Sequence, residues 1–299
     1  MADISVIILT FNEEKHITRC INSLKSFANE IFVVDSFSTD STVEMALSEG
    51  ATVFQNKYTN QAIQFNWALK TCPISTEWVM RIDADEYILP ELSIEINNKL
   101  PLLEKSISGI FIKRRVIFLN KWIKYGGNYP IWLLRIWRNG KGYCENRWID
   151  EYMKVTEGET TCFEMDFVDE NLNSLTRWIN KLNNHSTREM IVLILDKYQI
   201  SSKEEVTPKL TDSPDQRKRW FKHIYGKFPL FIRPLLLFLY IYFLRGGFRD
   251  GYPGLIRHFF IVFWYRFLVD SKIYEINKHC GKNLDATKNE IEKEYGYKI

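Results

Sequence analysis

The sequence contains no closely spaced cysteines. Its five cysteines are scattered, without a C-x-x-C pair: Cys20, Cys72, Cys144, Cys162 and Cys280. An odd and dispersed set argues against a disulfide framework and against a zinc site built from thiolates. The five histidines show no metal-ligand spacing either. We therefore expect reduced thiols in a cytosolic setting.

A strong net charge and a basic leader are also missing. The formal charge of +3 is too small to indicate a nucleic-acid partner. The first residues, MADISVIILTFNEE, hold a short apolar run with no basic residue before it. Such a segment is typical of a first strand and not of a signal peptide. We expect a cytoplasmic protein that does not bind nucleic acid.

No apolar run is long and clean enough for a clear membrane span. The longest, residues 228–244, has 17 residues and includes two prolines and Arg233. A spanning helix needs about 20 mostly apolar residues, and an arginine at its centre is costly. A second aromatic stretch, residues 259–269, is interrupted by Arg266. We interpret both as helices lying in the membrane interface with basic flanks toward lipid phosphates; a packed helical subdomain and a single span are the alternatives.

What the chain does have is a regular alternation of apolar runs and helical periodicity. Short apolar runs, the first of them mostly β-branched, predict strands over 4–9, 31–35, 52–54 and 78–83. Helical spacing predicts helices over 13–27, 41–50 and 61–71. This order predicts an α/β fold with a mostly parallel, doubly wound, Rossmann-like sheet flanked by helices. Further on, we predict strands over 109–119, 131–138 and 152–156 and a helix over 175–197.

Composition and pattern together predict three regions. Residues 1–200 form a first domain with halves 1–100 and 101–200, residues 201–216 form a polar linker, and residues 217–299 form a helical, membrane-associating tail. The hydrophobic share of 45% is sufficient for a full core, and the aromatic share of 15% indicates an interface.

Polar side chains gather where the predicted strands end. They are Thr10, Asn12 and Glu13 after the first strand, Asp35, Ser38 and Asp40 after the second, and Asp83, Ala84 and Asp85 after the fourth. Ligands of open parallel sheets bind beyond the carboxyl ends of the strands. Three acidic strand ends on one edge therefore indicate a ligand site.

The alternation Asp83-Ala84-Asp85 carries most of the chemistry. If the strand continues through it, both carboxylates point to one side, and the small Ala84 lets a bulky ligand approach. Paired hard oxygens favour Mg²⁺ or Mn²⁺, bound together with the phosphates of a substrate. By itself, such a motif is more commonly an acidic turn than a metal site.

A family resemblance strengthens the ligand interpretation. The strings TFNEEKHITRCINSL, VVDSFSTDST and EWVMRIDADE resemble family 2 glycosyltransferases in order and spacing, closely over about the first 90 residues. The strings YPIWLLRIWR and NRWIDEYM extend the match more loosely. The tail RPLLLFLYIYFLRGGFRDGYPGL is similar to the membrane-associated end of relatives that build lipopolysaccharide core or capsule. The resemblance implies the glycosyltransferase-A fold and an inverting reaction.

The resemblance also implies roles for single residues. The nucleotide pocket would be lined by Thr10, Asn12 and Glu13, and Asp35 would bind the base or ribose. The adjoining loop would be shaped by Ser38 and Asp40. Gln61 and Asn66 would reach the base or diphosphate, unless they are exposed helix residues. Asp85 would be the metal ligand, and Asp83 would contact ribose or the metal.

Inversion requires a base that takes the proton of the attacking hydroxyl. By the resemblance this is a carboxylate within Trp148-Ile149-Asp150-Glu151, and we favour Glu151 over Asp150. Many relatives have a histidine before this glutamate, where this chain has Asp150. Arg135 could pair with that carboxylate or with donor phosphate, or be an ordinary strand arginine.

We therefore expect a metal-dependent, inverting enzyme at the cytoplasmic face of the inner membrane, bound peripherally through its tail. It would transfer a sugar from a nucleotide-diphosphate donor, with uridine as the base by analogy, to a lipid-linked or lipopolysaccharide-type acceptor. Sugar-nucleotidyl transfer is an alternative, but TFNEEKH is not the glycine-rich basic loop that it requires. A non-catalytic membrane scaffold is another, against which the intact acidic set argues. Nothing in the sequence predicts the oligomeric state.

Overall fold

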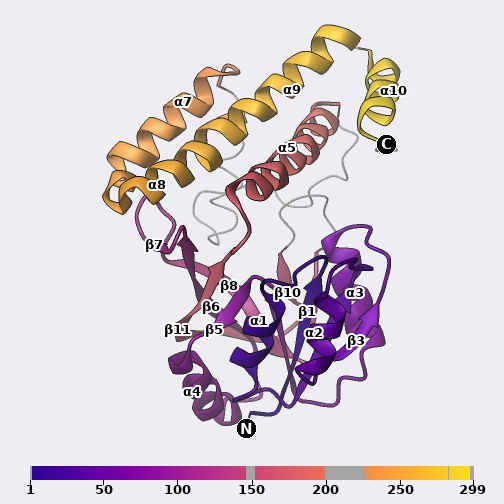
Figure 1. The fold of residues 1–299 in the computed structure, drawn as a ribbon, viewed down its shortest axis with the longest axis vertical. Coiled ribbons are helices and arrows are strands. Elements are labelled where there is room, and N and C mark those ends of the chain that lie inside the picture. Colours follow the sequence, from indigo (N-terminus) through magenta and orange to yellow (C-terminus); the bar gives the residue numbers. More distant parts are fainter. Residues whose placement is uncertain (1, 146–151, 199–224, 227, 282, 297–299) are drawn as a thin grey trace. The chain divides into compact units, whose positions relative to one another are not determined.

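The computed structural model describes residues 2–145, 152–198, 225–226, 228–281 and 283–296 of the 299-residue chain. It divides into two units, Met1–Asn173 and Ser174–Ile299, which we describe separately (Figure 1). The predicted linker over 201–216 lies outside the described residues. The division into domain, linker and tail therefore stays a prediction.

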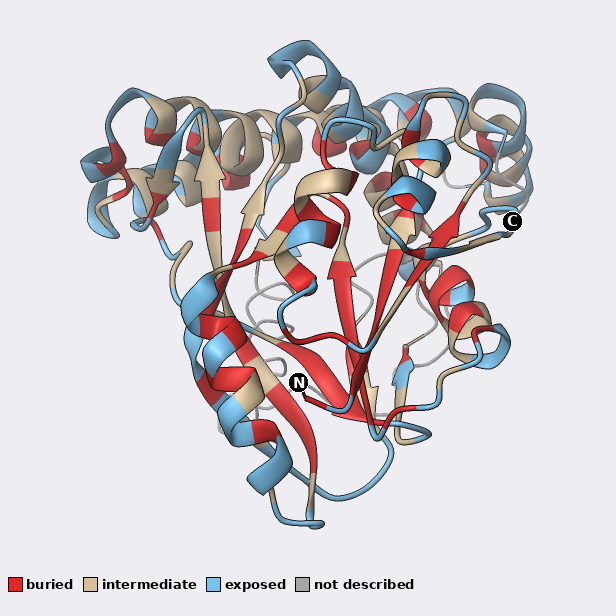
Figure 2. Ribbon diagram, turned by 60° about the horizontal axis from the view of Figure 1, so that its bottom comes forward, coloured by how far each residue is buried: buried red, intermediate tan, exposed pale blue. Residues whose placement is uncertain are grey.

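The first unit begins with a parallel sheet in the order β3-β2-β1-β4. Its strands are β1 (Ile4–Thr10), β2 (Glu30–Asp35), β3 (Thr52–Gln55) and β4 (Trp78–Asp83). The helices that connect them are α1 (Ile17–Leu24), α2 (Thr42–Ser48) and α3 (Gln61–Thr71). Ile8 and Ile7 of β1 belong to hydrophobic clusters on opposite faces of the sheet, so the strand is buried on both sides (Figure 2).

The same sheet continues as β4-β8-β6-β11-β5, with β7 paired to β6. The elements of this half are β5 (Glu86–Ile88), α4 (Pro90–Lys99), η1 (Leu100–Leu102), β6 (Ile107–Phe118), β7 (Lys121–Ile123), β8 (Ile131–Arg138) and β11 (Glu159–Glu170). Here β8 runs antiparallel to β4 and β6, whereas β11 is parallel to β6 and antiparallel to β5. A separate hairpin joins β9 (Gly142–Cys144) to β10 (Met153–Val155).

This mixed sheet between helices confirms the predicted α/β class. The predicted bounds of α3, β4 and β8 agree with the structure. The predicted helix over 13–27 is shorter and begins at Ile17, because Glu13 to His16 form a turn closed by His16 N donating to Glu13 O at 2.9 Å. Strands β5 and β11 and helix α4 are additions that the sequence pattern did not predict.

The second unit is helical in its described residues. It comprises α5 (Leu175–Lys197), α7 (Ile232–Leu239), η2 (Tyr240–Leu244), η3 (Gly247–Asp250), α8 (Gly251–His258), η4 (Phe259–Trp264), α9 (Tyr265–Cys280) and α10 (Leu284–Tyr295). Met190 and Ile194 of α5 pack against Val269 and Ile276 of α9 in its core. Within the described parts of the chain, no helix combines the length and apolarity that crossing a bilayer demands.

Arg233, the charge inside the longest apolar run, is buried against Asp270. Its Nε lies 2.9 Å from Asp270 Oδ1, and its Nη2 contacts the same oxygen. Phe231 N also donates to Asp270 Oδ2 at 2.9 Å. His258, which precedes the second aromatic stretch, is likewise buried and lies 2.6 Å from Gly254 O. These two groups therefore support the helical unit and are not available as basic flanks for lipid.

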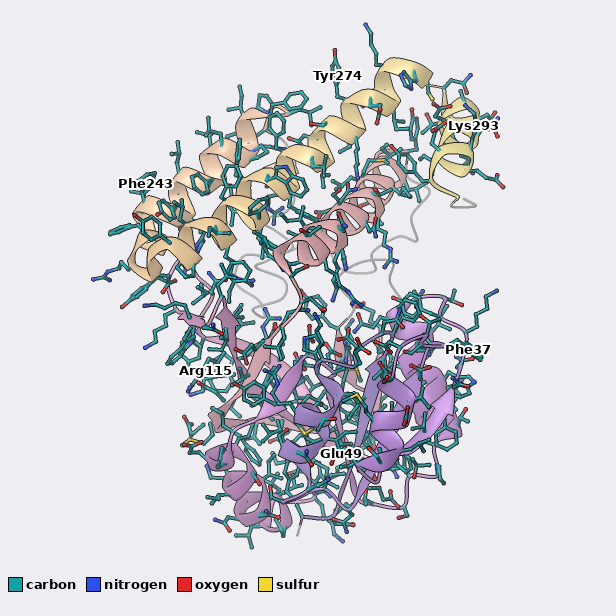
Figure 3. All side chains as sticks on the ribbon, viewed as in Figure 1. Phe37, Glu49, Arg115, Phe243, Tyr274 and Lys293 are labelled. Atoms are coloured by element: carbon teal, nitrogen blue, oxygen red, sulfur yellow. The ribbon has the colours of Figure 1, made fainter. Side chains whose placement is uncertain are left out.

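Many apolar side chains of α7, η2, η3 and α8 remain exposed. Those at least 41% exposed are Ile232, Leu235, Leu236, Leu239, Tyr240, Phe243, Leu244, Phe248 and Tyr252. Phe243 projects away from the helices (Figure 3). We call this set the apolar face of the second unit.

Candidate functional site

The strand ends that carry the predicted site residues are level with one another. In the β1–β2 ladder Thr10 is paired with Asp35, and in the β1–β4 ladder Leu9 is paired with Asp83. All three strands are parallel, so these carboxyl ends lie on one edge of the sheet. The structure thus brings the predicted strand-end residues together.

Asp35 is fully buried and supplied entirely with neutral donors. Its Oδ1 accepts from Thr10 Oγ1 at 3.0 Å and from Ser38 Oγ at 2.5 Å, and its Oδ2 accepts from Ser38 N at 2.8 Å and Gln55 Nε2 at 3.3 Å. A buried carboxylate needs such donors to offset its lost hydration. Asp35 therefore shapes the loop after β2, and its contact with base or ribose stays a prediction.

The loops after β1 and β2 are bound to each other. Asn12 N donates to Ser38 Oγ at 2.8 Å, and Asn12 Oδ1 accepts from Thr39 N at 2.8 Å. Asn12 and Phe37 both have positive φ, 56° and 61°, and Phe37 is 53% exposed (Figure 3). Such backbone conformations are uncommon for non-glycine residues and cluster at ligand-binding loops.

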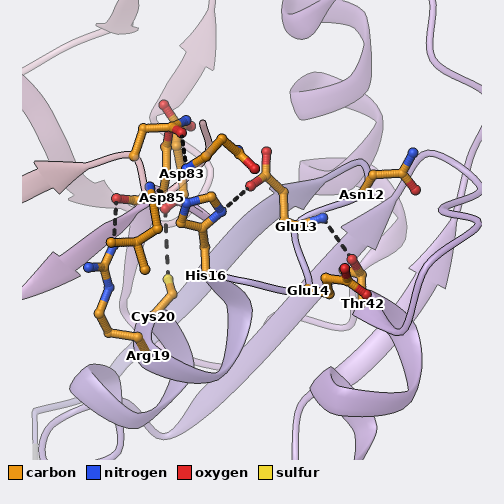
Figure 4. Close-up of polar contacts among 12 residues, drawn as sticks. Asn12, Glu13, Glu14, His16, Arg19, Cys20, Thr42, Asp83 and Asp85 are labelled. Carbon is orange, nitrogen blue, oxygen red and sulfur yellow. Dashed lines mark hydrogen bonds and ion pairs between the residues drawn. The ribbon is translucent and has the colours of Figure 1, made fainter. Parts of the chain in front are cut away.

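Glu13 and Asp40 share Thr42 as a hydrogen-bond partner, and Figure 4 shows the contact between Glu13 and Thr42. Glu13 N donates to Thr42 Oγ1 at 2.7 Å, and Thr42 Oγ1 donates to Asp40 Oδ1 at 2.5 Å. Burial alone would raise the pKa of the Asp40 carboxyl, but hydrogen bonds from Thr42 and Glu14 bring that pKa below its usual value. Asp40 is therefore an ionised support of the loop and of the start of α2.

Asp83 lies among arginines. Arg81 donates to its Oδ1 from Nη2 at 3.2 Å and from Nε at 3.3 Å, and Arg135 Nη2 lies 4.0 Å from Oδ2. The neighbouring Ala84 is buried, with 3% exposure. Arg81 had no predicted role, since a single basic residue in an apolar strand gives no pattern. Its contact makes Asp83 better suited to a neutral hydroxyl partner than to a second cation.

Arg135 and Glu86 form a buried, hydrogen-bonded pair. Arg135 Nη2 lies 2.5 Å from Glu86 Oε1, and the guanidinium lies 4.8 Å from the centre of the Phe167 ring. Burial raises the pKa of the Glu86 carboxyl to about 8, against the lowering effect of the Arg135 charge. Glu86 begins strand β5 and not a helix, and its Oε2 accepts from Asp83 N at 2.9 Å. The pair supports the turn that carries Asp83.

Asp85 is half-buried, as Asp83 is, but no lysine or arginine of the described ranges forms an ion pair with it. Its Oδ2 accepts from Asn171 Nδ2 at 3.1 Å, and its carbonyl oxygen accepts from Glu170 N at 3.0 Å. Glu170 is the last residue of β11 and Asn171 follows it. The sequence signal of this strand is the alternation Phe163-Glu164-Met165-Asp166-Phe167. Asn171 is a site residue that the sequence analysis missed.

The donor chemistry at Asp85 fits a hard divalent cation. Carboxylate oxygens are the protein ligands that Mg²⁺ and Mn²⁺ prefer, and Mg²⁺ commonly uses only one or two of them plus substrate phosphates. Across the described residues, no cluster of three or more His, Cys, Asp and Glu side chains could hold a metal by itself. Asp85 would be the main ligand, with Asp83 beside it.

Two predicted residues lie on α3. Asn66 uses both polar atoms of its side chain on Cys144: Nδ2 donates to Cys144 O at 2.8 Å, and Oδ1 accepts from Cys144 N at 2.9 Å. Gln61 opens the helix and is half-buried. The predicted bases, Asp150 and Glu151, lie outside the described residues, so their role stays a prediction.

Comparison with known proteins shows a family match for the part of the chain that carries most of this site. Residues 5–142 match the family model described as "Glycosyl transferase family 2". A Rickettsia typhi protein named as an uncharacterized glycosyltransferase is 43% identical over 96 residues, which are 32% of each chain. The matched region thus spans about a third of the length of this relative and of its counterparts in Rickettsia prowazekii and Rickettsia bellii.

Two further similarities cover different shares of the chain. A crystal structure of glucosyl-3-phosphoglycerate synthase from Mycobacterium tuberculosis aligns with 38% of this chain and 44% of that chain, with a TM-score of 0.32 and 24% identity. The lipopolysaccharide core biosynthesis glycosyltransferase LpsC of Rhizobium meliloti is 28% identical over 91% of this chain and 92% of its own. The family match and the names of these relatives confirm the resemblance predicted from the motifs.

Proposed function

We propose that this chain, in which residues 5–142 form a glycosyltransferase family 2 domain, transfers a sugar from a nucleoside-diphosphate sugar to a saccharide acceptor with inversion. The observation that carries the proposal is Asp85. It is a carboxylate on the ligand-binding edge of the sheet, oriented by an amide and paired with none of the described cations. Such a group is suited to recruiting a metal together with a diphosphate.

Asp85 would hold Mn²⁺ or Mg²⁺, with Asp83 in the neighbouring position. The bound ion would supply positive charge against the developing charge of the diphosphate leaving group. The remaining tasks fall to the chain itself. Arg81, Arg135 and Glu86 keep the turn of residues 83–86 in one conformation, through the hydrogen bonds and ion pairs described above.

The nucleotide would lie against the paired loops of residues 10–13 and 35–40. Their mutual hydrogen bonds, from Asn12 to Ser38 and from Thr39 to Asn12, already hold the loops in one arrangement. A preformed site reduces the entropy that ligand binding would otherwise cost. Uridine is the base that the family resemblance implies, and UDP-sugars are the first donors to test.

Glu151, or Asp150 beside it, would take the proton from the acceptor hydroxyl as that oxygen attacks the anomeric carbon. The acceptor would be a lipid-linked or lipopolysaccharide-type saccharide at the cytoplasmic membrane face. The likeness to LpsC along nearly the whole chain supports this class of acceptor. The apolar face of the second unit supports a peripheral attachment to the membrane surface.

The decisive experiment measures release of nucleoside diphosphate from a panel of nucleotide sugars, with Mn²⁺ and with chelator. The wild-type chain should release UDP slowly without acceptor, in a metal-dependent manner. Asp85→Asn should lower the metal-dependent rate by at least about 100-fold, because it removes the anionic ligand. Asp285→Asn, at an exposed aspartate in the first turn of α10, is the matched control and should keep full activity.

Two results would contradict the proposal. Equal rates in chelator and in Mn²⁺ would exclude the metal role of Asp85. Absence of hydrolysis in the wild type with every donor, together with no donor-induced thermal stabilisation, would favour a binding scaffold over an enzyme.

A further inference from the structure

We propose that Asn171 is a positioning residue that orients the Asp85 carboxylate for its divalent cation. The inference rests on the proposed function, because it assumes that Asp85 is the metal ligand. It concerns a residue outside the family match of residues 5–142, contributed by the segment that follows β11.

The orientation of the Asn171 amide follows from its two partners. Its Oδ1 accepts from Asn173 N at 2.9 Å, and its Nδ2 lies 3.1 Å from Asp85 Oδ2. One neighbour can only donate, and the other, as a carboxylate, can only accept. The reversed amide would face both with the wrong atom, so the geometry assigns the NH₂ group to Asp85.

This hydrogen bond gives the two oxygens of the Asp85 carboxylate different roles. Oδ2 is engaged by Asn171, whereas Oδ1 accepts no hydrogen bond from the described side chains. A ligand whose second oxygen is hydrogen-bonded is held in one rotamer, and its free oxygen keeps a fixed direction toward the ion. Partners of this kind typically contribute 10- to 100-fold to metal affinity.

The main chain of Asp85 is held by the same segment. Glu170 N donates to Asp85 O at 3.0 Å, and Arg19 Nη2 reaches both Glu170 O at 2.6 Å and Asp85 O at 3.4 Å. Arg19 Nη1 also lies 2.5 Å from Glu170 Oε2. Backbone and side chain of Asp85 are thus fastened to neighbouring residues of one short segment, which limits how far the carboxylate can move.

The segment of residues 170–172 is also connected to Glu13 through His16, and Figure 4 shows the contact between His16 and Glu13. Leu172 N donates to Nε2 of the buried His16 at 2.8 Å, and His16 Nδ1 lies 2.6 Å from Glu13 Oε2. Because Nε2 accepts, Nδ1 carries the hydrogen and donates to Glu13. The segment that carries Asn171 is therefore itself held in place, through His16, by Glu13 of the loop after β1.

The test compares Asn171→Ser with the wild type in the full-length chain. Serine can accept from Asn173 N as asparagine does, because both residue types form this local turn, but its shorter side chain does not reach Asp85. The variant should keep the melting temperature of the wild type to within a few degrees. Its affinity for Mn²⁺ in the presence of UDP should fall about 10- to 100-fold, as measured by electron paramagnetic resonance of free Mn²⁺.

Two further variants complete the design. Asn139→Ser removes an exposed amide that donates to Thr76 O at 3.2 Å, remote from the site, and should leave Mn²⁺ binding unchanged. Asn171→Gln retains the NH₂ donor on a longer side chain and should recover part of the lost affinity. A purely structural role would not respond to restoring the donor.

The outcomes separate the two proposals. If wild type binds Mn²⁺ with UDP and Asn171→Ser binds it within twofold of wild type, the positioning role is wrong and the proposed function stands. If Asn171→Ser and Asn171→Gln lose the same affinity, the donor is not what matters and the inference is again overturned. If wild type binds no Mn²⁺ in the presence of UDP, the metal assignment of the proposed function fails first.

Discussion

The carboxylates of the candidate site differ mainly in what surrounds each of them. Asp35 receives neutral hydroxyl, amide and backbone donors, Asp83 receives arginines, and Asp85 receives a single amide. Opposite charges and hydrogen bonds stabilise a carboxylate's ionised form, whereas burial without them does the reverse. From these surroundings we assign Asp35 to the support of a loop, Asp83 to pairing with arginines and Asp85 to binding a cation, although the three residues look alike in the sequence.

Glu86 makes the folding stability depend on pH. Its folded pKa of about 8 exceeds the ordinary value of 4.5, so the folded state binds more protons between these limits. Its contribution is fully present below the ordinary pKa and is lost as pH rises through about 8. We expect the free energy of unfolding to fall from pH 6 to pH 9, and to fall less in Glu86→Gln, in urea titrations at each pH.

Glu86→Gln also loses one acceptor for Asp83 N, so its stability at pH 6 should be lower than that of the wild type. The diagnostic quantity is therefore the slope with pH and not the absolute value. Identical slopes for the two proteins would show that another group titrates.

The identity of the base is a prediction at the same scale. Glu151→Gln should reduce transfer to acceptor by about 100-fold or more, because general base catalysis contributes about 10²- to 10⁴-fold. Binding of UDP with Mn²⁺ should be unaffected, since the base acts on the acceptor. Asp150→Asn provides the comparison, and a larger loss in it than in Glu151→Gln would reverse our assignment.

Secondary-structure elements were predictable where their pattern is local. The short, mostly apolar run of β4 and the helical spacing of α3 predict the observed bounds directly. Strand β11 was missed although residues 163–167 alternate apolar and polar side chains. Its ladder with β6 shifts register between Cys162 and Asp166, so the burial along the strand does not follow that alternation. Helix α4 was missed because its buried side includes Ser93 and Glu95 while Ile94 is 60% exposed, which weakens the apolar periodicity in the sequence.

The candidate site also contains residues that could be predicted from the sequence and contacts that could not. Thr10, Asp35 and Asp83 could be grouped from the sequence because parallel strands bring their carboxyl ends to one edge. Arg19 and Glu170 meet although 151 positions separate them. Their contact depends on where β11 enters the sheet, and no local pattern encodes that choice.

Asn66 gives a prediction at the scale of elements, since it fastens α3 to β9. Asn66→Ala leaves the backbone N–H and C=O of the buried Cys144 without this partner, which should cost about 1–3 kcal/mol of stability. If the role is structural, the KM for donor should stay within about twofold of wild type while the Tm falls. A raised KM at unchanged Tm would instead support the donor contact that the family resemblance implies.

For the molecule as a whole, the second unit combines a buried charge pair with an exposed apolar face. The sequence indicated the apolar helices, but not that Arg233 is neutralised by Asp270, a residue 37 positions away. Removing one partner of such a pair typically costs about 3–5 kcal/mol, because it leaves a buried charge alone. The face itself is what we expect to meet the membrane surface.

Membrane attachment is the prediction at this scale. Leu236→Ser, Leu239→Ser and Phe243→Ser together remove apolar side chains that are 41% to 56% exposed, so folding should be little affected. Binding to anionic liposomes should weaken at least tenfold in sedimentation assays, since tenfold corresponds to only about 1.4 kcal/mol. Leu102→Ser, at a position 82% exposed in the first unit, is the control. Unchanged sedimentation of the triple variant would show that this face does not mediate binding.

The late position of β11 has a consequence for protein synthesis. When a ribosome has translated residue 142, every residue of the family match exists, but Glu170 and Asn171, which hydrogen-bond to Asp85, do not. These contacts are made about 30 residues later, between 142 and 172, as Glu170, Asn171 and Leu172 appear. A nascent chain elongates at about 5–20 residues per second, so a few seconds pass between the synthesis of residue 142 and that of Asn171, the hydrogen-bond partner of the Asp85 carboxylate. A fragment that ends at residue 142, where the family match ends, would lack Glu170 and Asn171 altogether.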